Sequence, residues 1–295
     1  MATHESVLLN EVLEWLKPKA GEIFVDGTIG LGGHAASLLD ATSPEGILIG
    51  VDKDPYAIAQ ARARLSPFGK RAMLIQDDYQ NIAQCLRRLG FAQVQWVLLD
   101  LGVSSMQLDE GARGFSFRLD GPLDMRMNPQ ETFSARQVVN EASAEQLESI
   151  FRKYGQERFA RSIARKIVMM RERRPLETTK ELEAVIFYSV PKSYRYGRIH
   201  PATRCFQALR IAVNQELESL ENFLKLGVDY LSAKARIAVI SFHSLEDGIV
   251  KRAFRQMQQE GLGVALTKKP IEATEFERAC NPRSRSAKLR VFEKN

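Results

Sequence analysis

The chain has 295 residues, of which 44% are hydrophobic and 26% charged, a composition typical of a globular protein with a full hydrophobic core. No run of about 18 apolar residues and no basic-then-apolar leader occurs, so we expect a cytoplasmic protein without a membrane segment. Three widely spaced cysteines and four scattered histidines show no metal-ligand spacing, so we expect no bound metal. The formal net charge of +6 is a weak indication of a polyanionic partner.

The first predicted elements are an amphipathic helix over residues 4–16 and a short apolar strand over residues 23–25. The strand runs into a glycine-rich turn, Asp26-Gly-Thr-Ile-Gly-Leu-Gly-Gly-His34, and a helix follows from about residue 35. Glycines allow positive φ and let a ligand approach the backbone closely. A strand, a glycine-rich turn and a helix in this order are typical of a cofactor loop on the first strand of an α/β sheet.

Spacing alone leaves two cofactors open for this turn. Residues 30–35 fit the dinucleotide pattern G-x-G-x-x-G/A, and Asp52 follows about 20 residues later, so NAD is one candidate. However, Asp26 precedes the turn and no Lys or Arg lies between Lys19 and Lys53, so a pyrophosphate would meet a carboxylate and no cation. S-adenosylmethionine (SAM) carries a sulfonium and an ammonium and no phosphate. We therefore favour SAM over NAD.

Strands and helices then alternate, with strands predicted over residues 46–52, 72–76 and 94–100 and helices over residues 55–65 and 81–89. Asp26, Asp52 and Asp100 each end a strand. The carboxyl ends of parallel strands meet at one edge of a doubly wound sheet, so we expect these acids to line one crevice. Asp52 is placed to accept both ribose hydroxyls of an adenosine, whereas its alternative role as a helix cap already fits Asp54. Asp77-Asp78-Tyr79 ends the third strand, where an adenine would lie.

The alternation stops near residue 111, and from residue 134 some 90 residues read as helical, including a capping box at Ser143-Ala-Glu-Gln and a long helix over residues 203–226. Nine Lys/Arg and two Glu occur between Arg152 and Arg174, opposite an apolar helix face, which favours phosphate contacts over a merely solvated face. The segment Tyr194-Arg-Tyr-Gly-Arg-Ile-His200 mixes aromatic and cationic side chains, a composition suited to RNA.

The α/β pattern resumes with strands predicted over residues 235–243, 263–267 and 288–293, and Ser244-Leu-Glu-Asp has the spacing of a second capping box. Residues 1–110 and 215–295 are therefore predicted to form one discontinuous α/β cofactor domain. Residues 111–214 are predicted to form an inserted helical domain that recognises the substrate.

The chain resembles the bacterial 16S ribosomal RNA cytosine-N(4)-methyltransferases, the RsmH or MraW family, almost end to end. The resemblance rests on eight motifs: His4-x-x-Val-Leu-Leu, Asp26-Gly-Thr-x-Gly-x-Gly-Gly-His34, Leu99-Asp-Leu-Gly-Val-Ser-Ser, Arg113-Gly-Phe-Ser-Phe, Gly121-Pro-Leu-Asp-Met-Arg-Met, His200-Pro-Ala-Thr-Arg, Ile240-Ser-Phe-His-Ser-Leu-Glu-Asp and Asn281-Pro-Arg-x-Arg-Ser. Two positions depart from the family pattern, because Tyr79 stands where Phe is usual and Met106 where Pro is usual.

The resemblance implies a class I SAM-dependent methyltransferase, a Rossmann-like α/β fold, that N(4)-methylates a decoding-centre (P-site) cytosine of 16S rRNA in the small ribosomal subunit. It places the SAM contacts on Gly32, Gly33, His34, Asp52, Tyr79, Asp100 and Gln107. For the RNA, His200 and Arg204 are candidate backbone contacts and His243 a candidate proton acceptor or stacking partner; a buried capping role is the alternative for His243.

No catalytic base is assigned from the sequence. Well-known amino methyltransferases carry a D/N/S-P-P-Y/F motif after the fourth strand, but this position reads Asp100-Leu-Gly-Val. Two other classes of function remain open at this point. An NAD-linked oxidoreductase would use the same turn, and a non-catalytic RNA-binding assembly factor would keep the basic insert but would not need acids at three strand ends.

Overall fold

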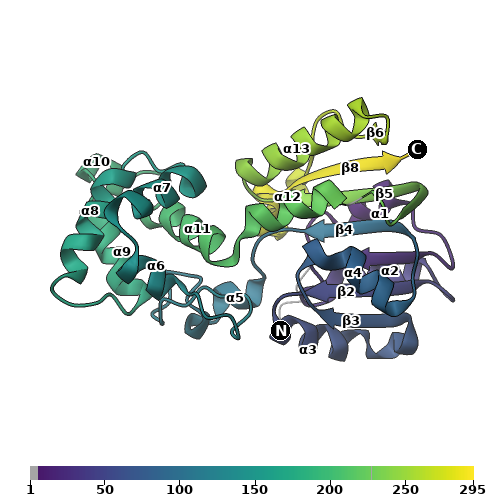
Figure 1. The fold of residues 1–295 in the computed structure, drawn as a ribbon, viewed down its shortest axis with the longest axis horizontal. Coiled ribbons are helices and arrows are strands. Elements are labelled where there is room, and N and C mark those ends of the chain that lie inside the picture. Colours follow the sequence, from purple (N-terminus) through teal and green to yellow (C-terminus); the bar gives the residue numbers. More distant parts are fainter. Residues whose placement is uncertain (1–5, 227) are drawn as a thin grey trace. The chain divides into compact units, whose positions relative to one another are not determined.

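The computed structural model describes residues 6–226 and 228–295, and their contacts divide the chain into two units (Figure 1). One unit comprises residues 1–102 and 217–295, and the other residues 103–216. Residues 103–110 were predicted to belong to the α/β domain but lie in the helical unit, because Val103 and Leu108 pack against its core. The colours of Figure 1 show the chain leaving the sheet after β4 and returning to it with β5.

The α/β unit is built on an eight-stranded sheet with the order β3-β2-β1-β4-β5-β8-β6, and β7 pairs with β8. Strands β1 to β5 are parallel to their neighbours, whereas β8 is antiparallel to β5, β6 and β7. The strands are β1 Ile23–Asp26, β2 Ile47–Asp52, β3 Ala72–Gln76, β4 Val94–Asp100, β5 Leu231–Ser241, β6 Gly263–Ala265, β7 Ile271–Glu272 and β8 Lys288–Lys294. The doubly wound α/β class predicted from the sequence is confirmed.

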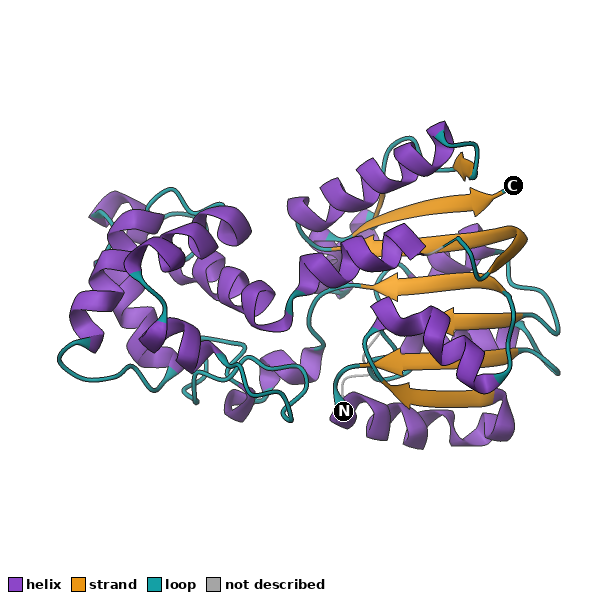
Figure 2. Cartoon of the chain, in the orientation of Figure 1, coloured by secondary structure: helices purple, strands orange, loops and turns teal. Residues whose placement is uncertain are grey.

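Helices cover both faces of this sheet (Figure 2) because successive strand residues point to opposite faces. Phe24 packs with α1, α2 and α3 on one face, and Val25 packs with α4, α12 and α13 on the other. The helices of this unit are α1 Leu9–Leu16, α2 Gly33–Ala41, α3 Pro55–Leu65, α4 Ile82–Leu89, α12 Glu216–Leu226, α13 Ser244–Gln259 and α14 Glu275–Cys280. With both faces covered, the functional surface of the sheet lies at its strand ends.

The helical unit has a core of its own, and its helices are α5 Ser105–Asp109, α6 Ala135–Glu141, α7 Ala144–Gly155, α8 Ala160–Arg171, α9 Thr179–Tyr188, α10 Lys192–Arg195 and α11 Pro201–Asn214. Side-chain caps begin several of them, including the predicted capping box of Ser143 and Gln146. The last residue of α7, Gly155, packs against α11 so closely that a Cβ there would lie 2.6 Å from the carbonyl oxygen of Arg204.

A side chain of α11 holds the long loop before α6. The amide of Asn214, which is 2% exposed, donates to the carbonyl oxygen of Met125 (2.8 Å) and accepts from the backbone N–H of Met127 (2.7 Å). The loop therefore has a fixed course without regular secondary structure, because its polar backbone groups find side-chain partners.

The predicted helix over residues 203–226 is wrong as a single element. Gln215 has φ +53°, and this left-handed residue ends α11 and separates it from α12. The predicted second capping box is displaced by one residue, because His243 rather than Ser244 is the N-cap of α13 and pairs with Glu246. The short elements β7 and α14 were not predicted.

Two further expectations bear on the chain ends and on membranes. The first residues of the predicted helix over residues 4–16, including His4 of the first motif, lie outside the described residues, and α1 begins at Leu9. In the part of the chain that the structure describes, no helix is both long and apolar enough to cross a membrane.

Candidate functional site

The glycine turn between β1 and α2 lies at the carboxyl edge of the parallel strands. Gly30 and Gly32 have φ of +50° and +73°, a conformation that other residues rarely adopt. A Cβ on Gly33 would lie 2.2 Å from the hydroxyl oxygen of Ser6. Gly32 and Gly33 therefore shape a turn that brings backbone N–H groups to the start of α2, as the sequence suggested.

Asp52 ties the end of β2 to this turn. Its Oδ2 accepts from the backbone N–H of Gly30 and its Oδ1 from that of Asp54, each at 2.9 Å. Each carboxylate oxygen has two lone pairs, so one on each oxygen remains for a further donor. Asp54 itself caps α3 by accepting from the N–H of Tyr56 at 3.0 Å. The geometry thus gives the capping role to Asp54 and leaves Asp52 able to accept a pair of hydroxyls.

One buried carboxyl group, that of Asp26, and two partly buried ones, those of Asp52 and Asp100, meet around the turn because β2, β1 and β4 are neighbours in the sheet. Burial raises the pKa of Asp26 to about 7 and that of Asp52 to about 6. Burial, with the nearby charges of Asp26 and Glu246, raises the pKa of Asp100 well above its usual value. Within the described residues, Oδ1 of Asp100 is buried without a hydrogen-bond partner. Two cations border the turn: Lys53, whose charge lowers the pKa of Asp52, and Arg64, whose Nη1 would lie 3.7 Å from a Cβ on Gly33.

His34 bridges the turn and the segment before α1. Its Nε2 lies 2.9 Å from the carbonyl oxygen of Val7, and its Nδ1 lies 3.6 Å from Oδ2 of Asp100. A carbonyl oxygen accepts only, so Nε2 carries the proton, and in the neutral ring Nδ1 faces Asp100 with its lone pair. His34 is 5% exposed, so it contributes to the site through its contact with Asp100 rather than as a surface residue.

At the end of β3, Asp78 and Tyr79, two of the residues predicted to lie near an adenine, have different surroundings. Asp78, 8% exposed, accepts from the hydroxyl of Ser219 and pairs with Lys53, each at 2.7 Å, so it is committed to the fold. Tyr79 is half-buried and packs edge-on against Phe223. A Cβ on Gly27 would lie 3.0 Å from Cβ of Tyr79, so this side chain borders the glycine turn. Sequence reasoning did not predict Lys53 as a structural partner, although it directly follows Asp52.

Gln107 lies in the helical unit, unlike the other six residues assigned to SAM by resemblance. Its side-chain oxygen accepts from the backbone N–H of Ser104 (2.9 Å), and its own N–H donates to the Ser104 hydroxyl (3.2 Å), so the pair forms the capping box of α5. The structure brings together Gly32, Gly33, His34, Asp52, Tyr79 and Asp100, and gives Gln107 a structural role in α5.

His243, a candidate for proton acceptance, is the N-cap of α13. Its Nδ1 accepts from the N–H of Glu246 at 3.3 Å, and Oε2 of Glu246 accepts in return from the N–H groups of Phe242 and His243. The capping alternative is therefore the role that the structure shows. Glu246, which is 2% exposed and raises the pKa of Asp100 by its charge, was not predicted as part of this edge. Glu246 would have been predicted if the capping box had been read with His243, rather than Ser244, as its first residue.

In the helical unit, His200 is also built into the fold. Its ring stacks between Phe117 (4.8 Å between centroids) and Phe187 (5.6 Å), its Nδ1 accepts from the N–H of Ala202, and its Nε2 lies 3.2 Å from Glu183. Nη1 of Arg204 lies 3.5 Å from the hydroxyl of Tyr194. Both side chains support the surface on which the sequence placed RNA contacts.

The α/β unit suits a cationic ligand. Three carboxyl groups with raised pKa, one of them with a buried oxygen that has no partner among the described residues, favour a ligand that brings positive charge, and a pyrophosphate would add negative charge to them. Lys53, the cation nearest in sequence, already pairs with Asp78. SAM meets this condition through its ammonium and sulfonium. The residues present therefore fit SAM and disfavour NAD.

Comparison with known proteins agrees with this geometry. The model of the MraW methylase family matches residues 1–295. Three proteins called "Ribosomal RNA small subunit methyltransferase H" are similar over 99% of this chain and 98% of their own length. They come from Syntrophotalea carbinolica (49% identical), Geotalea uraniireducens (49%) and Geobacter sp. strain M21 (50%).

Proposed function

Because the chain belongs to the MraW methylase family, we propose that it transfers the methyl group of SAM to the N4 amine of a decoding-centre cytosine in 16S rRNA. The chain is an rRNA methyltransferase, SAM is its methyl donor, and its α/β unit has the class I methyltransferase fold. The proposal adds the cytosine, its N4 atom, the small subunit as substrate particle and the cytoplasm as the place of action. The structural observation that supports it is the cluster of carboxyl groups with raised pKa at the glycine turn.

Each residue at the carboxyl edge has a proposed task toward SAM. Gly32 and Gly33 offer backbone N–H groups and a close approach, and Asp52 accepts the two ribose hydroxyls with its remaining lone pairs. Tyr79 packs on the adenine, and Asp100, oriented by His34, faces the positive charge of the methionine part. We assign Gln107 to the same ligand by family resemblance only, because its capping role in α5 is what its contacts support.

The chemistry requires alignment and a dry site more than a strong base. SAM supplies an electrophilic methyl group when bound. The cytosine amine is a weak nucleophile because its lone pair is delocalised into the ring, so hydrogen bonds that orient it contribute most. Burial and nearby acidic charges raise the pKa of Asp100, and the positive charge of SAM would lower it again.

The helical unit has the proposed task of holding the RNA. The target base must be unpaired or swung out of its stack to reach a methyl group. Arg204 and His200 support the RNA-facing surface through Tyr194 and Phe117, and His243 is proposed to orient the N-terminus of α13 beside the reacting base. Charge complementarity with phosphates supports this assignment.

The deciding experiment is methyl transfer from labelled SAM to small ribosomal subunits that lack base methylation, followed by separation of the product nucleosides. We expect label in N4-methylcytidine. Asp52→Ala should abolish the label through weaker SAM binding, whereas Asp40→Ala, which removes an exposed carboxylate at the far end of α2, should not. Label in another nucleoside would overturn the assigned target, and measurable SAM binding without any label would overturn the assigned substrate.

A further inference from the structure

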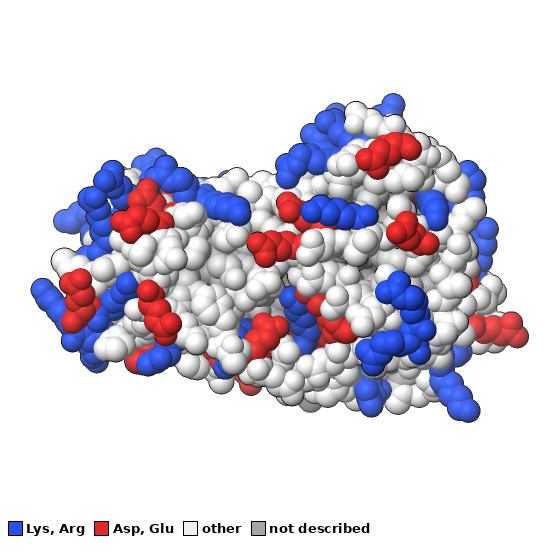
Figure 3. Space-filling model, viewed as in Figure 1, with Lys and Arg blue, Asp and Glu red and all other residues white. Residues whose placement is uncertain are grey.

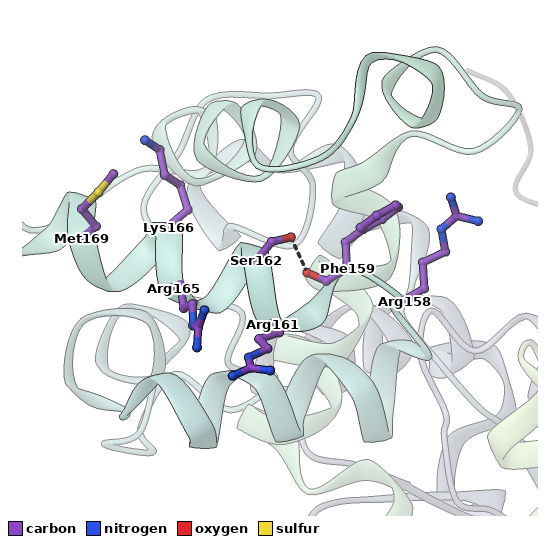
Figure 4. A pocket seen from close by; sticks show the side chains of 7 residues that line it. All are labelled: Arg158, Phe159, Arg161, Ser162, Arg165, Lys166 and Met169. Atoms are coloured by element: carbon purple, nitrogen blue, oxygen red, sulfur yellow. Dashed lines mark hydrogen bonds between the residues drawn. The ribbon is translucent and has the colours of Figure 1, made fainter.

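Helix α8 and the two residues before it line a pocket of about 520 Å³ on the helical unit (Figure 4). The lining residues all come from this one segment: Arg158, Phe159, Arg161, Ser162, Arg165, Lys166 and Met169. Their spacing of three or four residues places them along one side of the helix, while Ile163 and Ile167 are buried in the core on the other side. In Figure 3, Lys and Arg side chains gather over the part of this unit that contains α8 and α10.

Within the described residues, the cations of the pocket form no close ion pair, although hydrogen bonds and, to a smaller extent, the charge of Arg165 lower the pKa of Glu145. Arg152 pairs with Glu148 before the pocket, and Arg174 pairs with Glu181 after it. Across residues 6–226 and 228–295, no ion pair is formed by any of the four cations that line the pocket, which are Arg158, Arg161, Arg165 and Lys166. Four adjacent cations repel one another in the free protein, so an anionic ligand relieves a cost that the fold leaves in place.

Arg158 is held ready for such a ligand by two aromatic rings. Its guanidinium lies 4.5 Å from the centroid of Phe159 and 5.0 Å from that of Tyr194, and the two rings pack edge-on at 4.8 Å. Stacking fixes the plane of a guanidinium and leaves its N–H donors free for a phosphate. The hydroxyl of Tyr194 donates to Glu157 (2.8 Å), which is 2% exposed, so this ring is fixed from inside.

A series of side-chain contacts connects the pocket to exposed aromatic rings. Tyr194 belongs to α10, and Arg195 in the same helix stacks over Phe187 and Tyr188 of α9. Tyr188 is 66% exposed, and Tyr196, which packs edge-on against Phe187, is 80% exposed. Large aromatic rings left in water beside cations are the composition of a surface that stacks unpaired bases.

We propose that the α8 pocket binds the backbone of an unpaired rRNA segment and that Tyr196 and Tyr188 stack on bases of the same segment. The proposal rests on the function given above and specifies which surface of the helical unit meets the RNA. The four cations bind phosphates of this segment. The exposed tyrosines favour a single strand over a duplex, because bases that are paired and stacked offer no free face to a tyrosine ring.

The first test measures binding of the full-length protein to unmethylated small subunits as a function of salt. For a single strand, log K falls against log salt with a slope of about 0.7 per phosphate contact. The triple variant Arg158→Gln, Arg161→Gln, Arg165→Gln should therefore flatten the slope by about 2 and weaken binding about ten-fold or more at 0.15 M salt. The matched triple Arg62→Gln, Arg87→Gln, Arg88→Gln removes the same charge from exposed positions on α3 and α4 and should leave the slope near the wild-type value.

Two further variants separate this role from a structural one. Replacing the same three arginines by lysine keeps the charge and should restore most of the slope. Tyr196→Ala should weaken subunit binding several-fold, whereas Tyr196→Phe should not, because stacking needs the ring and not the hydroxyl. SAM affinity and turnover at saturating subunit should stay within about two-fold of wild type in all of them, with the loss confined to KM.

The outcomes distinguish this inference from the function on which it rests. If wild-type protein fails to methylate subunits, the proposed function is at fault. If wild-type protein methylates them and the glutamine triple keeps the wild-type slope and KM, the α8 surface is not the RNA site. A photocrosslinking side chain introduced at Tyr196 should attach to rRNA, and attachment to a ribosomal protein instead would overturn the proposal.

Discussion

Asp26, Asp52 and Asp100 are the residues whose charge state links stability to ligand binding. An unfolded chain would ionise all three near pH 4, but burial raises the folded pKa of Asp26 to about 7 and that of Asp52 to about 6. The folded protein therefore holds protons that the unfolded chain has already released, and the stability gained from holding them is lost as the pH rises.

We predict that these groups stabilise the ligand-free protein most at and below about pH 4 and progressively less as the pH rises. Their contribution is fully present below about pH 3.8, and its loss is complete once the pH has passed about 6 for Asp52 and about 7 for Asp26. Each group contributes a slope of up to about 1.4 kcal/mol per pH unit within its window. Urea unfolding at several pH values measures this slope, which Asp26→Asn should reduce and Asp40→Asn should not. An unchanged slope in Asp26→Asn would contradict the prediction.

A second prediction concerns the ligand itself. SAM brings positive charge to carboxyl groups that are partly protonated when the site is empty, so its binding should release protons and tighten as the pH rises from about 5.5 to about 7.5. Calorimetric titrations in buffers of different ionisation enthalpy count the protons released. A binding enthalpy that is independent of the buffer at pH 6.5 would show that the carboxyls are already ionised.

Among the elements, α7 and α11 form the closest helix contact for which a single glycine is responsible. Gly155→Ala should destabilise the protein by about 1–3 kcal/mol, because the new Cβ would lie 2.6 Å from the carbonyl oxygen of Arg204 and the backbones must separate. Gly248→Ala in α13 is the matched control. There a Cβ meets only the flexible end of Arg252 at 3.2 Å, so alanine should be neutral or stabilising by up to about 1 kcal/mol. Denaturant midpoints of the two variants test this contrast, and equal shifts would refute it.

The elements also show what could be predicted from sequence. The strands ending in Asp26, Asp52 and Asp100 were predicted within a residue or two at each end because apolar runs between helices have few alternatives in an α/β chain. The break between α11 and α12 was missed because Gln215 adopts the left-handed backbone at the end of α11 without being a glycine, the usual sequence signal of such an end. The capping-box spacing was placed one residue late, on Ser244, because serine is the stronger local capping residue, although capping was the alternative role given for His243.

The site followed the same rule. Acids at strand ends and the glycine turn were readable, since topology alone brings strand ends together. Hydrogen-bond partners from distant segments could not be predicted from the sequence. Examples are the Val7 carbonyl, which fixes the tautomer of His34, and the Ser219 hydroxyl, which donates to Asp78. Tyr194 and His200 were predicted as RNA contacts by composition, but Glu157 and two phenylalanines fix their rings in partly buried positions. The most exposed ring of this segment is that of Tyr196.

At the scale of the whole molecule, two hydrophobic cores share one chain, and the proposed ligands divide between them. Saturating SAM should stabilise the α/β unit by about 2.7 kcal/mol at a hundred times its Kd. Hydrogen exchange should therefore slow in β1, α2 and β2, with little change in α7, α8 and α9. Equal protection of both units would show that they unfold together.

The position of the insert also has a consequence during synthesis on the ribosome. Strand β4 lies between β1 and β5 in the sheet, yet residues 103–216 must be translated before β5 appears. At about 5–20 residues per second, the apolar edge of β4 waits unpaired for on the order of ten seconds while the helical unit emerges and folds. A nascent chain stalled within the insert therefore presents an open β-edge to chaperones until β5, which begins at Leu231, pairs with it.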